Sequence, residues 1–203
     1  MEQSKKECIL SAATRAFSRF GFKKTSVDEI AKSAGVAKGT VYLAADTKED
    51  LFYQAVHREV RAWTAELSKL IDPRVPADEL LRKCAAAGLH YLRDRPLVRE
   101  LLFGSHDVLL PEWSERLEEL RDLGRSNALE ILRLGVKQGV FRRDLDLDQV
   151  SQLLQDVTIS TFLFHDRGPD RAARLARRAD AAFDLLLNGL RSVRAKAKEH
   201  SAG

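Results

Sequence analysis

The segment SVDEIAKSAGVAKGTVYL, residues 26–43, combines residue types and spacing that suit contact with DNA. It predicts two short helices joined by a tight turn at Gly35, the arrangement that presents the second helix to a major groove. Small residues at the start of this second helix would let its backbone approach a duplex closely. The residues on or beside its exposed side are Ala37, Lys38, Gly39, Thr40 and Tyr42.

Residues suited to catalysis show no comparable pattern. The run Gly104-Ser105-His106 lacks the strand, turn and helix that a nucleophile elbow requires. A glycine loop that could cradle phosphate is also missing from the sequence. We therefore predict that the protein is not an enzyme and needs no metal or cofactor. The histidines, none of them spaced like metal ligands, are His57, His90, His106, His165 and His200.

The elements that must position the 26–43 segment are helices, because alternating strand patterns are nearly absent. Ser26 stands three residues before Glu29 as a capping box, and Thr47 has the residue type of an N-cap. We expect an all-α fold of about nine helices. Its N-terminal three-helix domain, residues 1–46, would precede a larger helical effector-binding and dimerisation domain, residues 47–203.

Apolar side chains at helical spacing predict where the individual helices lie. In the first of them, residues 5–20, Phe20 falls on the apolar stripe and Gly21 at the stopping position. Prolines mark several of the later starts. The other expected ranges with defined ends are 26–34, 37–43, 47–71, 111–139, 147–166 and 169–198.

The composition is that of a globular protein with a real core. Of its 203 residues 44% are hydrophobic and 32% charged, and the net charge of +4 is compatible with nucleic acid. No stretch is apolar enough to span a membrane, and the first residues do not read as a secretion signal, so we expect a cytoplasmic protein without a membrane partner. Cys8 and Cys84 are expected to be small buried side chains.

A longer pattern over residues 9–52 contains this segment. It reads IL-x-AA-x₃-F-x₃-G-x₃-TS-x₃-IA-x₂-AGV-x-KGTVY-x₄-TKEDLF, which resembles the signature of TetR-family transcriptional regulators. The close match covers residues 5–55, about a quarter of the chain. The resemblance implies a homodimer that binds double-stranded operator DNA and an unidentified small-molecule effector.

 The long fourth helix would join the two domains, so an effector that favours one tilt of this helix would change the separation of the two DNA-contacting helices. Operator affinity would fall only in proportion to the difference in effector affinity between the two states.

Carried onto this sequence, the resemblance gives DNA-contacting roles to seven residues. Thr25 and Ser26 would touch phosphate near the start of the second helix, and Lys48 would hold a phosphate at the start of the fourth. The groove and its walls would be met by Lys38, Gly39, Thr40 and Tyr42. For each lysine, the alternative is an ordinary solvated charge.

The chain departs from the family pattern after Tyr42. The family usually has a further aromatic or histidine followed by phenylalanine, whereas this chain has Leu43, Ala44 and Ala45. Replacing a buried phenylalanine by alanine costs ~3–5 kcal/mol where nothing compensates. Either neighbouring residues have adapted or the DNA-binding unit is loosened. The second possibility gives an alternative function, a helical interaction protein that has kept the fold but weakened its DNA binding.

Two further sets of residues are expected from the stripes of the later helices. Large or unexpectedly polar side chains on inward stripes are effector-pocket candidates, with plain core packing as the alternative. A very apolar helix at 147–166 would pair with the last helix across a two-fold axis, which would make the operator palindromic. The pocket candidates are Trp63, His90, Phe103, His106, Trp113 and Asn127, and the interface candidates are Val150, Leu154, Val157, Thr161, Phe164, Phe183, Leu186 and Leu190.

Overall fold

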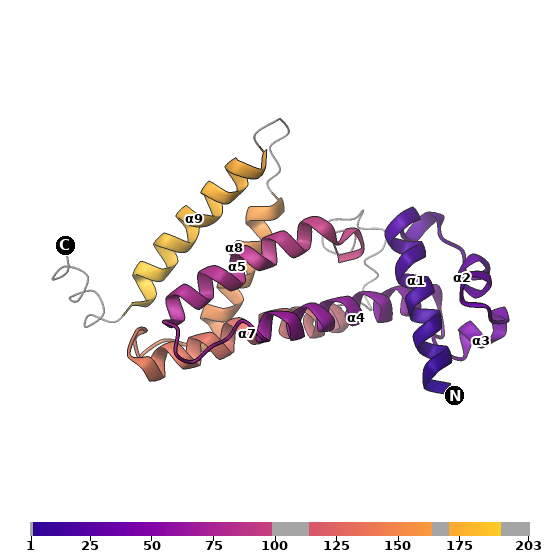
Figure 1. Ribbon diagram of the computed structural model, residues 1–203, viewed down its shortest axis with the longest axis horizontal. Helices are drawn as coiled ribbons and strands as arrows, with labels where there is room; N and C mark the ends of the chain where they lie inside the picture. Colours follow the sequence, from indigo (N-terminus) through magenta and orange to yellow (C-terminus); the bar gives the residue numbers. More distant parts are fainter. Residues whose placement is uncertain (1, 99–113, 164–170, 192–203) are drawn as a thin grey trace. The chain divides into compact units, whose positions relative to one another are not determined.

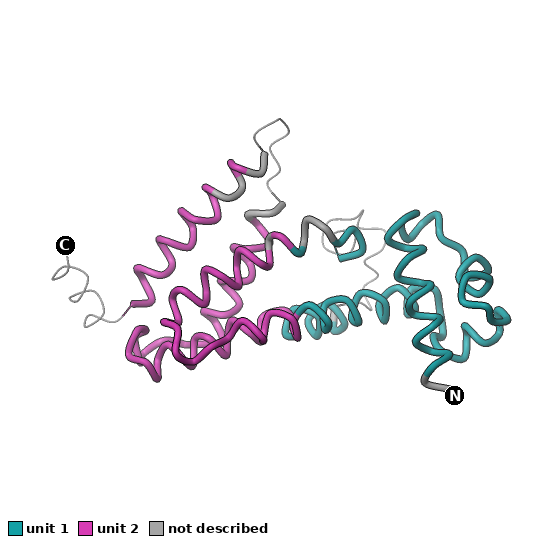
Figure 2. The backbone as a smooth tube through the Cα atoms, in the orientation of Figure 1, with its two compact units in different colours: residues 1–63, 91–123 teal, residues 64–90, 124–203 magenta. Residues whose placement is uncertain are grey.

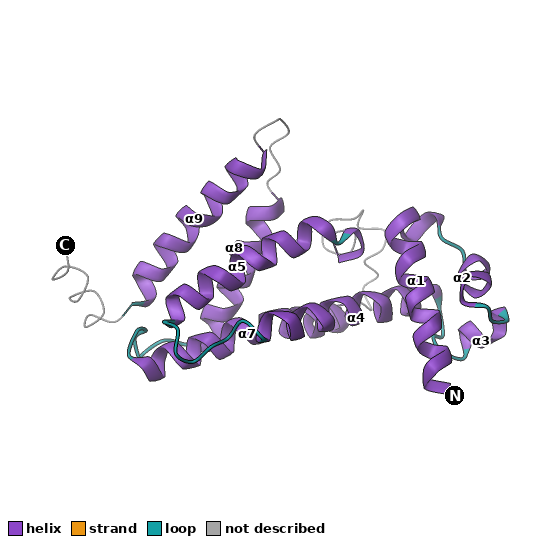
Figure 3. Cartoon of the chain, viewed as in Figure 1, coloured by secondary structure: helices purple, strands orange, loops and turns teal. Residues whose placement is uncertain are grey.

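The computed structural model describes residues 2–98, 114–163 and 171–191 of the chain (Figure 1). Within these ranges the protein is helical (Figure 3). Its one β pairing there is an isolated bridge between Phe141 and Arg191. The predicted all-α fold is therefore confirmed. The helices are α1 (Glu2–Lys24), α2 (Val27–Ala34), α3 (Lys38–Tyr42), α4 (Lys48–Ser68), α5 (Ala77–Asp94), α7 (Ser114–Gln138), α8 (Leu147–Leu163) and α9 (Arg171–Leu190).

The chain divides into two compact units (Figure 2). Unit 1 comprises residues 1–63 and 91–123, and unit 2 comprises residues 64–90 and 124–203. The helices α4, α5 and α7 each contribute residues to both units. The functional boundary expected between residues 46 and 47 stays a prediction.

Helix α1 changes direction at Gly21, whose φ of 78° lies in the left-handed region that glycine tolerates. The hydroxyl of Thr25 donates to the Gly21 carbonyl at 2.8 Å and so closes this kink. Gly21 therefore interrupts the first helix as predicted. Phe20 was expected on the buried stripe but is exposed, and the Arg19 guanidinium lies 5.0 Å from its ring centre, so that prediction was wrong.

Helix α2 begins and ends as its sequence predicts. Ser26 accepts a hydrogen bond from the Glu29 backbone, while the Glu29 carboxylate accepts one from the Ser26 N–H at 3.0 Å, which completes the capping box. Gly35 ends the helix in the left-handed conformation, with a φ of 68°. The turn that follows leads directly into α3.

An aromatic cluster forms the centre of the N-terminal core. The rings of Phe17 and Phe22 each meet Phe52 of α4 at 5.2 Å in edge-to-face contacts, and all three side chains are buried. Ile30 of α2 and Val41 of α3 are also buried. Burial of one apolar side chain from each short helix fixes the face that α2 and α3 turn to solvent.

Unit 2 has its own core, contributed by α5, α7, α8 and α9. Phe141 packs so closely on Gly135 that a methyl group at Gly135 would overlap its ring. Gln138 joins α7 to the start of α5, since its amide oxygen accepts from the Ala77 N–H at 2.9 Å and its nitrogen donates to the Pro73 carbonyl at 2.9 Å. This core supports the α7 segment of unit 2.

One helix end and one cysteine differ from expectation. Helix α4 ends at Ser68, not at residue 71, because the chain turns through Leu70 and Ile71 before the proline that follows. Cys84 is buried as predicted, but Cys8 is exposed on the solvent side of α1, so its predicted burial was wrong. Among the described helices, none combines the length and apolar character needed to cross a lipid bilayer.

Candidate nucleic-acid interface

Helix α3 presents one buried residue and a continuous exposed surface. Val41 points into the core, while Lys38, Gly39 and Tyr42 are exposed and Thr40 is half-buried. Leu43, directly after the helix, is 88% exposed. Lys38, Gly39 and Tyr42 therefore share one accessible face, and Leu43 adds an apolar side chain that the sequence did not single out. An exposed leucine beside this face suits contact with sugar carbons or thymine methyl groups.

Gly39 has no structural need to be glycine. A Cβ atom built at this position meets nothing within 4 Å, and the backbone lies in a helix without positive φ. Glycine inside a helix costs about 0.5–1 kcal/mol relative to alanine. The open space above Gly39 is the geometry needed for close approach of another molecule to the α3 backbone.

Lys38 is paired within the protein. Its Nζ lies 2.8 Å from Oδ2 of Asp28 in the first turn of α2, and both side chains are largely exposed. The hydrogen bond and charge of Asp28 raise the pKa of Lys38, which keeps it cationic. A phosphate brought to Lys38 must therefore compete with an acidic neighbour that spacing along the sequence did not identify.

The two residues expected to touch phosphate before α2 have different positions. Thr25 is only 2% exposed, and its hydroxyl is used inside the fold by the Gly21 carbonyl. A phosphate contact by this side chain is therefore not supported, because the hydroxyl fixes the α1 kink. Ser26 is exposed, and its hydroxyl is engaged with Glu29 in the capping box. Both residues position α2 from within the protein.

Lys48 lies at the first position of α4, where backbone N–H groups also point outward. Its Nζ is 4.4 Å from the centre of the Phe22 ring. This cation–π contact holds the half-buried side chain against the N-terminal core. The charge of Lys48 is thus kept at the start of α4.

Ala45, where the family pattern has phenylalanine, is itself buried. Its N–H donates to the Val41 carbonyl at 3.1 Å, which extends the last turn of α3. The preceding carbonyl, that of Ala44, accepts a hydrogen bond from Nε2 of Gln54 at 3.0 Å. The exit of α3 is therefore held by its own last turn and by a hydrogen bond from α4.

A second polar cluster lies in unit 1 around Trp63, one of the pocket candidates. The indole ring stacks on Tyr91 with 4.8 Å between ring centres, and Tyr91 donates its hydroxyl to the Glu59 carbonyl at 2.8 Å. Nη1 of Arg95 lies 3.3 Å from Oε1 of Glu59. The indole nitrogen of Trp63 and Oε2 of Glu59 are buried without a hydrogen-bond partner in the part of the chain described.

This cluster offers one donor and one acceptor from adjacent turns of α4. The Glu59 side chain is only 11% exposed, and its burial raises the pKa of the carboxyl group against the opposing effect of Arg95. Sequence reasoning selected Trp63 but missed Glu59. Its place four residues before Trp63 on the same helix was the available signal.

The remaining pocket candidates are not brought together by the described residues. Asn127, in unit 2, is buried, and its amide donates to the Thr64 carbonyl at 2.9 Å, so this amide has the partner that its burial demands. His90 is exposed in the same unit. Phe103, His106 and Trp113 lie outside the described residues, and the pocket itself stays a prediction.

The interface candidates separate into two groups. Leu154, Phe183 and Leu190 are buried in the core of their own unit, because the strongest apolar stripe of α8 and α9 faces inward. They are therefore not available as a contact surface, which corrects their assignment. Val150, Val157 and Leu186 are half-buried. The side chain of Thr161 and the whole of Phe164 lie outside the description.

Two exposed leucines were missed on these same helices. Leu185 of α9 is 77% exposed, and Leu153 of α8 is 49% exposed. Each lies within two residues of a core residue in sequence, so the apolar stripe alone gave no reason to select it. Within the described ranges, no group of histidine, cysteine and acidic side chains could hold a metal ion.

Known proteins resemble the chain over both this region and its full length. The family described as "Bacterial regulatory proteins, tetR family" matches residues 9–55. The fatty acid metabolism regulator protein of Bacillus subtilis is 25% identical, over 90% of this chain and 93% of its own. The transcriptional repressor KstR2 of Mycolicibacterium smegmatis is 26% identical, over 92% and 91%.

Solved structures agree in fold. FadR from Bacillus subtilis, in complex with stearoyl-CoA, superposes with a TM-score of 0.69 at 22% identity and covers 91% of this chain and 98% of its own. A transcriptional regulator from Cytophaga hutchinsonii gives a TM-score of 0.71 at 21% identity, over 92% and 98%. The relatives named here are regulators, and no enzyme family is indicated. Residues 9–55 thus match the tetR family of bacterial regulatory proteins, and along most of its length the chain is similar to transcriptional regulators.

Proposed function

We propose that the protein is a homodimeric repressor that binds a palindromic operator and leaves it when a small-molecule effector binds. The observation that carries the DNA-binding part is the open surface of α3, where Gly39 has free space above it and Lys38 and Tyr42 are exposed beside it. A helix with this surface can enter a major groove, and a two-fold dimer would present two such helices to two half-sites.

The effector part of the proposal draws on unit 1. Trp63 and Glu59 leave one buried donor and one buried acceptor without partners in the described chain, and such atoms are rare unless something binds them. The FadR neighbour was solved with stearoyl-CoA, so acyl-CoA thioesters are suitable first probes for an effector. The dimer part draws on Leu153 and Leu185, large apolar side chains that a second copy would cover.

Selection from a random DNA pool tests the operator. We expect the winning sequence to be an inverted repeat, and its affinity to fall steeply with salt, by ~10³–10⁵ between 50 and 200 mM if 6–10 phosphates are contacted. A winner without symmetry would contradict the dimer. Weak, salt-insensitive binding with no selected sequence would favour the alternative of an interaction protein. Addition of stearoyl-CoA to the bound complex then tests release.

A further inference from the structure

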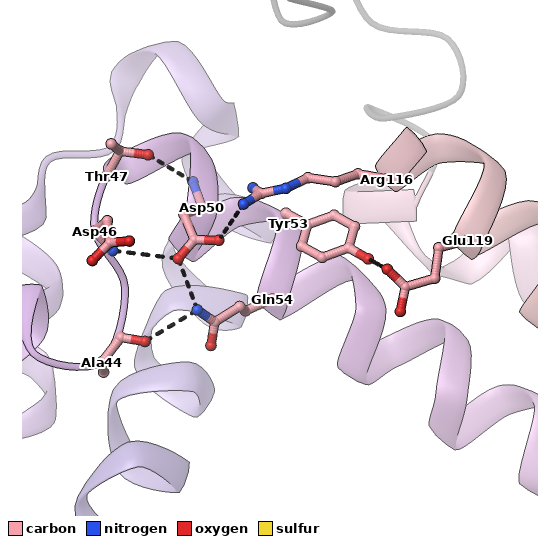
Figure 4. A network of polar contacts seen from close by, with 8 residues as sticks. All are labelled: Ala44, Asp46, Thr47, Asp50, Tyr53, Gln54, Arg116 and Glu119. Atoms are coloured by element: carbon pink, nitrogen blue, oxygen red, sulfur yellow. Dashed lines mark hydrogen bonds and ion pairs between the residues drawn. The ribbon is translucent and has the colours of Figure 1, made fainter. Parts of the chain in front are cut away.

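A chain of polar contacts runs from the exit of α3 to α7 within unit 1 (Figure 4). Asp50, in the first turn of α4, lies at its centre. One carboxylate oxygen accepts from the Asp46 N–H at 3.3 Å and from Nε2 of Gln54 at 2.9 Å. The same Gln54 nitrogen reaches the Ala44 carbonyl. Asp50 and Gln54 thus fix two of the residues that directly follow the recognition helix α3.

The other carboxylate oxygen of Asp50 binds α7. Its Oδ1 lies 3.0 Å from Nη2 of Arg116, and the Asp50 side chain is mostly buried. The Arg116 guanidinium also lies 4.8 Å from the centre of the Tyr53 ring. The Tyr53 hydroxyl in turn donates to the Glu119 carboxylate, one turn further along α7. The Tyr53 ring therefore orients the Arg116 guanidinium for its contact with Asp50.

We infer that Arg116 is a positioning residue for DNA binding, because it holds Asp50 in the orientation that fixes Ala44 and Asp46 behind the recognition helix. The alanine at position 45 is what makes this contact matter. Where a large aromatic side chain would anchor the exit of α3 by packing, this chain relies on one hydrogen bond from Asp46 to the Asp50 carboxylate and one from Gln54, itself bonded to Asp50, to the Ala44 carbonyl. A residue on α7 thereby affects the groove-facing helix through Asp50 of α4.

Single substitutions test the inference on the duplex that wild-type protein selects from a random pool. Arg116→Gln should weaken DNA binding about fivefold, which is the effect expected from the loss of one partly exposed ion pair. Arg133→Gln is the matched control, since it removes the same charge from an exposed position of α7. Asp50→Asn should weaken binding tenfold or more, about the effect of hydrogen bonds to a charged group. Asp46→Asn is its control, because the Asp46 backbone makes the contact and not its side chain.

The double variant and the salt dependence separate positioning from direct contact. Arg116→Gln combined with Asp50→Asn should bind no more weakly than Asp50→Asn alone, since both act through one carboxylate. The slope of log affinity against log salt should stay at the wild-type value in Arg116→Gln, whereas loss of a phosphate contact would reduce it by about 0.9. Equal losses for Arg116→Gln and Arg133→Gln, additive losses in the double variant, or a reduced slope would each overturn the inference.

A measurement without DNA keeps this inference separate from the operator proposal on which it rests. The Asp46 amide hydrogen should exchange faster in Arg116→Gln and Asp50→Asn than in the two controls. Failure of wild-type protein to select any duplex would count against the operator proposal alone, and unchanged Asp46 exchange would count against the positioning role alone. If Arg116→Gln does not fold, Arg116→Lys keeps the charge but loses the planar fork, and should show the same effects in weaker form.

Discussion

Oδ2 of Asp28 accepts a hydrogen bond from Nζ of Lys38, so the first residue of the recognition helix is bonded to the first turn of the helix before it. The contact joins the two helices of the DNA-binding motif on their solvent side. It also places a carboxylate next to a residue that would approach phosphate.

Asp28→Asn is expected to strengthen DNA binding about two- to fivefold, because it frees Lys38 and removes a negative charge from the interface. The selected duplex, titrated at fixed salt, measures the effect. Asp180→Asn on α9 changes the net charge equally at an exposed site in unit 2. Equal effects of the two substitutions would mean that Lys38 gains nothing from release.

Gly39→Ala should move stability and DNA binding in opposite directions. The added methyl group meets no atom of the protein, so removing a helical glycine should raise the free energy of unfolding by about 0.5–1 kcal/mol. The same methyl should hinder approach of a duplex and weaken binding at least tenfold, as for an overpacked contact. Urea unfolding and DNA titration give the two values.

The control for Gly39→Ala is Gly189→Ala in α9, which also has open space at its Cβ position. It should gain similar stability with unchanged DNA affinity. If Gly39→Ala behaved in the same way, the duplex would not approach α3 as closely as we propose.

Glu59→Gln should change how stability depends on pH. Burial raises the pKa of Glu59 in the folded protein above its unfolded value of about 4.3. The folded state therefore holds this proton more tightly, and wild-type stability falls as the pH rises from about 4.3 through the raised pKa. The variant, which cannot ionise there, should gain stability relative to wild type over that range.

Urea unfolding at a series of pH values measures this difference. Glu130→Gln, at an exposed position of α7, is the control and should follow the wild-type curve. Parallel curves for Glu59→Gln and wild type would show that burial does not govern this carboxyl group.

If two copies pair through α9 as we propose, Leu185→Asp should convert the dimer to a monomer, since a charge at this 77% exposed position would have to be buried in the contact. Sedimentation velocity gives the mass. Leu70→Asp, at another exposed leucine, is the control and should leave the dimer intact. A dimer that survives Leu185→Asp would place the interface elsewhere.

The sequence predicted the local elements better than the surroundings of each side chain. Gly21, Ser26 and Gly35 act within a few residues of themselves, so their roles could be read directly. Thr25 has the residue type of a phosphate contact, yet its hydroxyl turns back to the kink that Gly21 makes. Its direction depends on the path of the chain, which spacing does not contain.

Helical periodicity in the sequence does not predict which side chains from distant segments come into contact. The contacts of Arg116 with Asp50 and of Tyr91 with Glu59 depend on how α4 packs against other helices. The apolar stripe of α9 likewise predicted burial for Phe183 and Leu190, but could not say that the partner would be the same subunit.

Helix α4 makes polar contacts at two positions along its length. Asp50 pairs with Arg116 of α7, and the backbone carbonyl of Glu59 accepts a hydrogen bond from Tyr91 of α5. An α-helix turns about 100° per residue, so one residue inserted between Asp50 and Glu59 would aim one of these groups away from its partner. This stretch of α4 has a length that evolution cannot readily change. Relatives that differ in size should carry their insertions in the connections between helices.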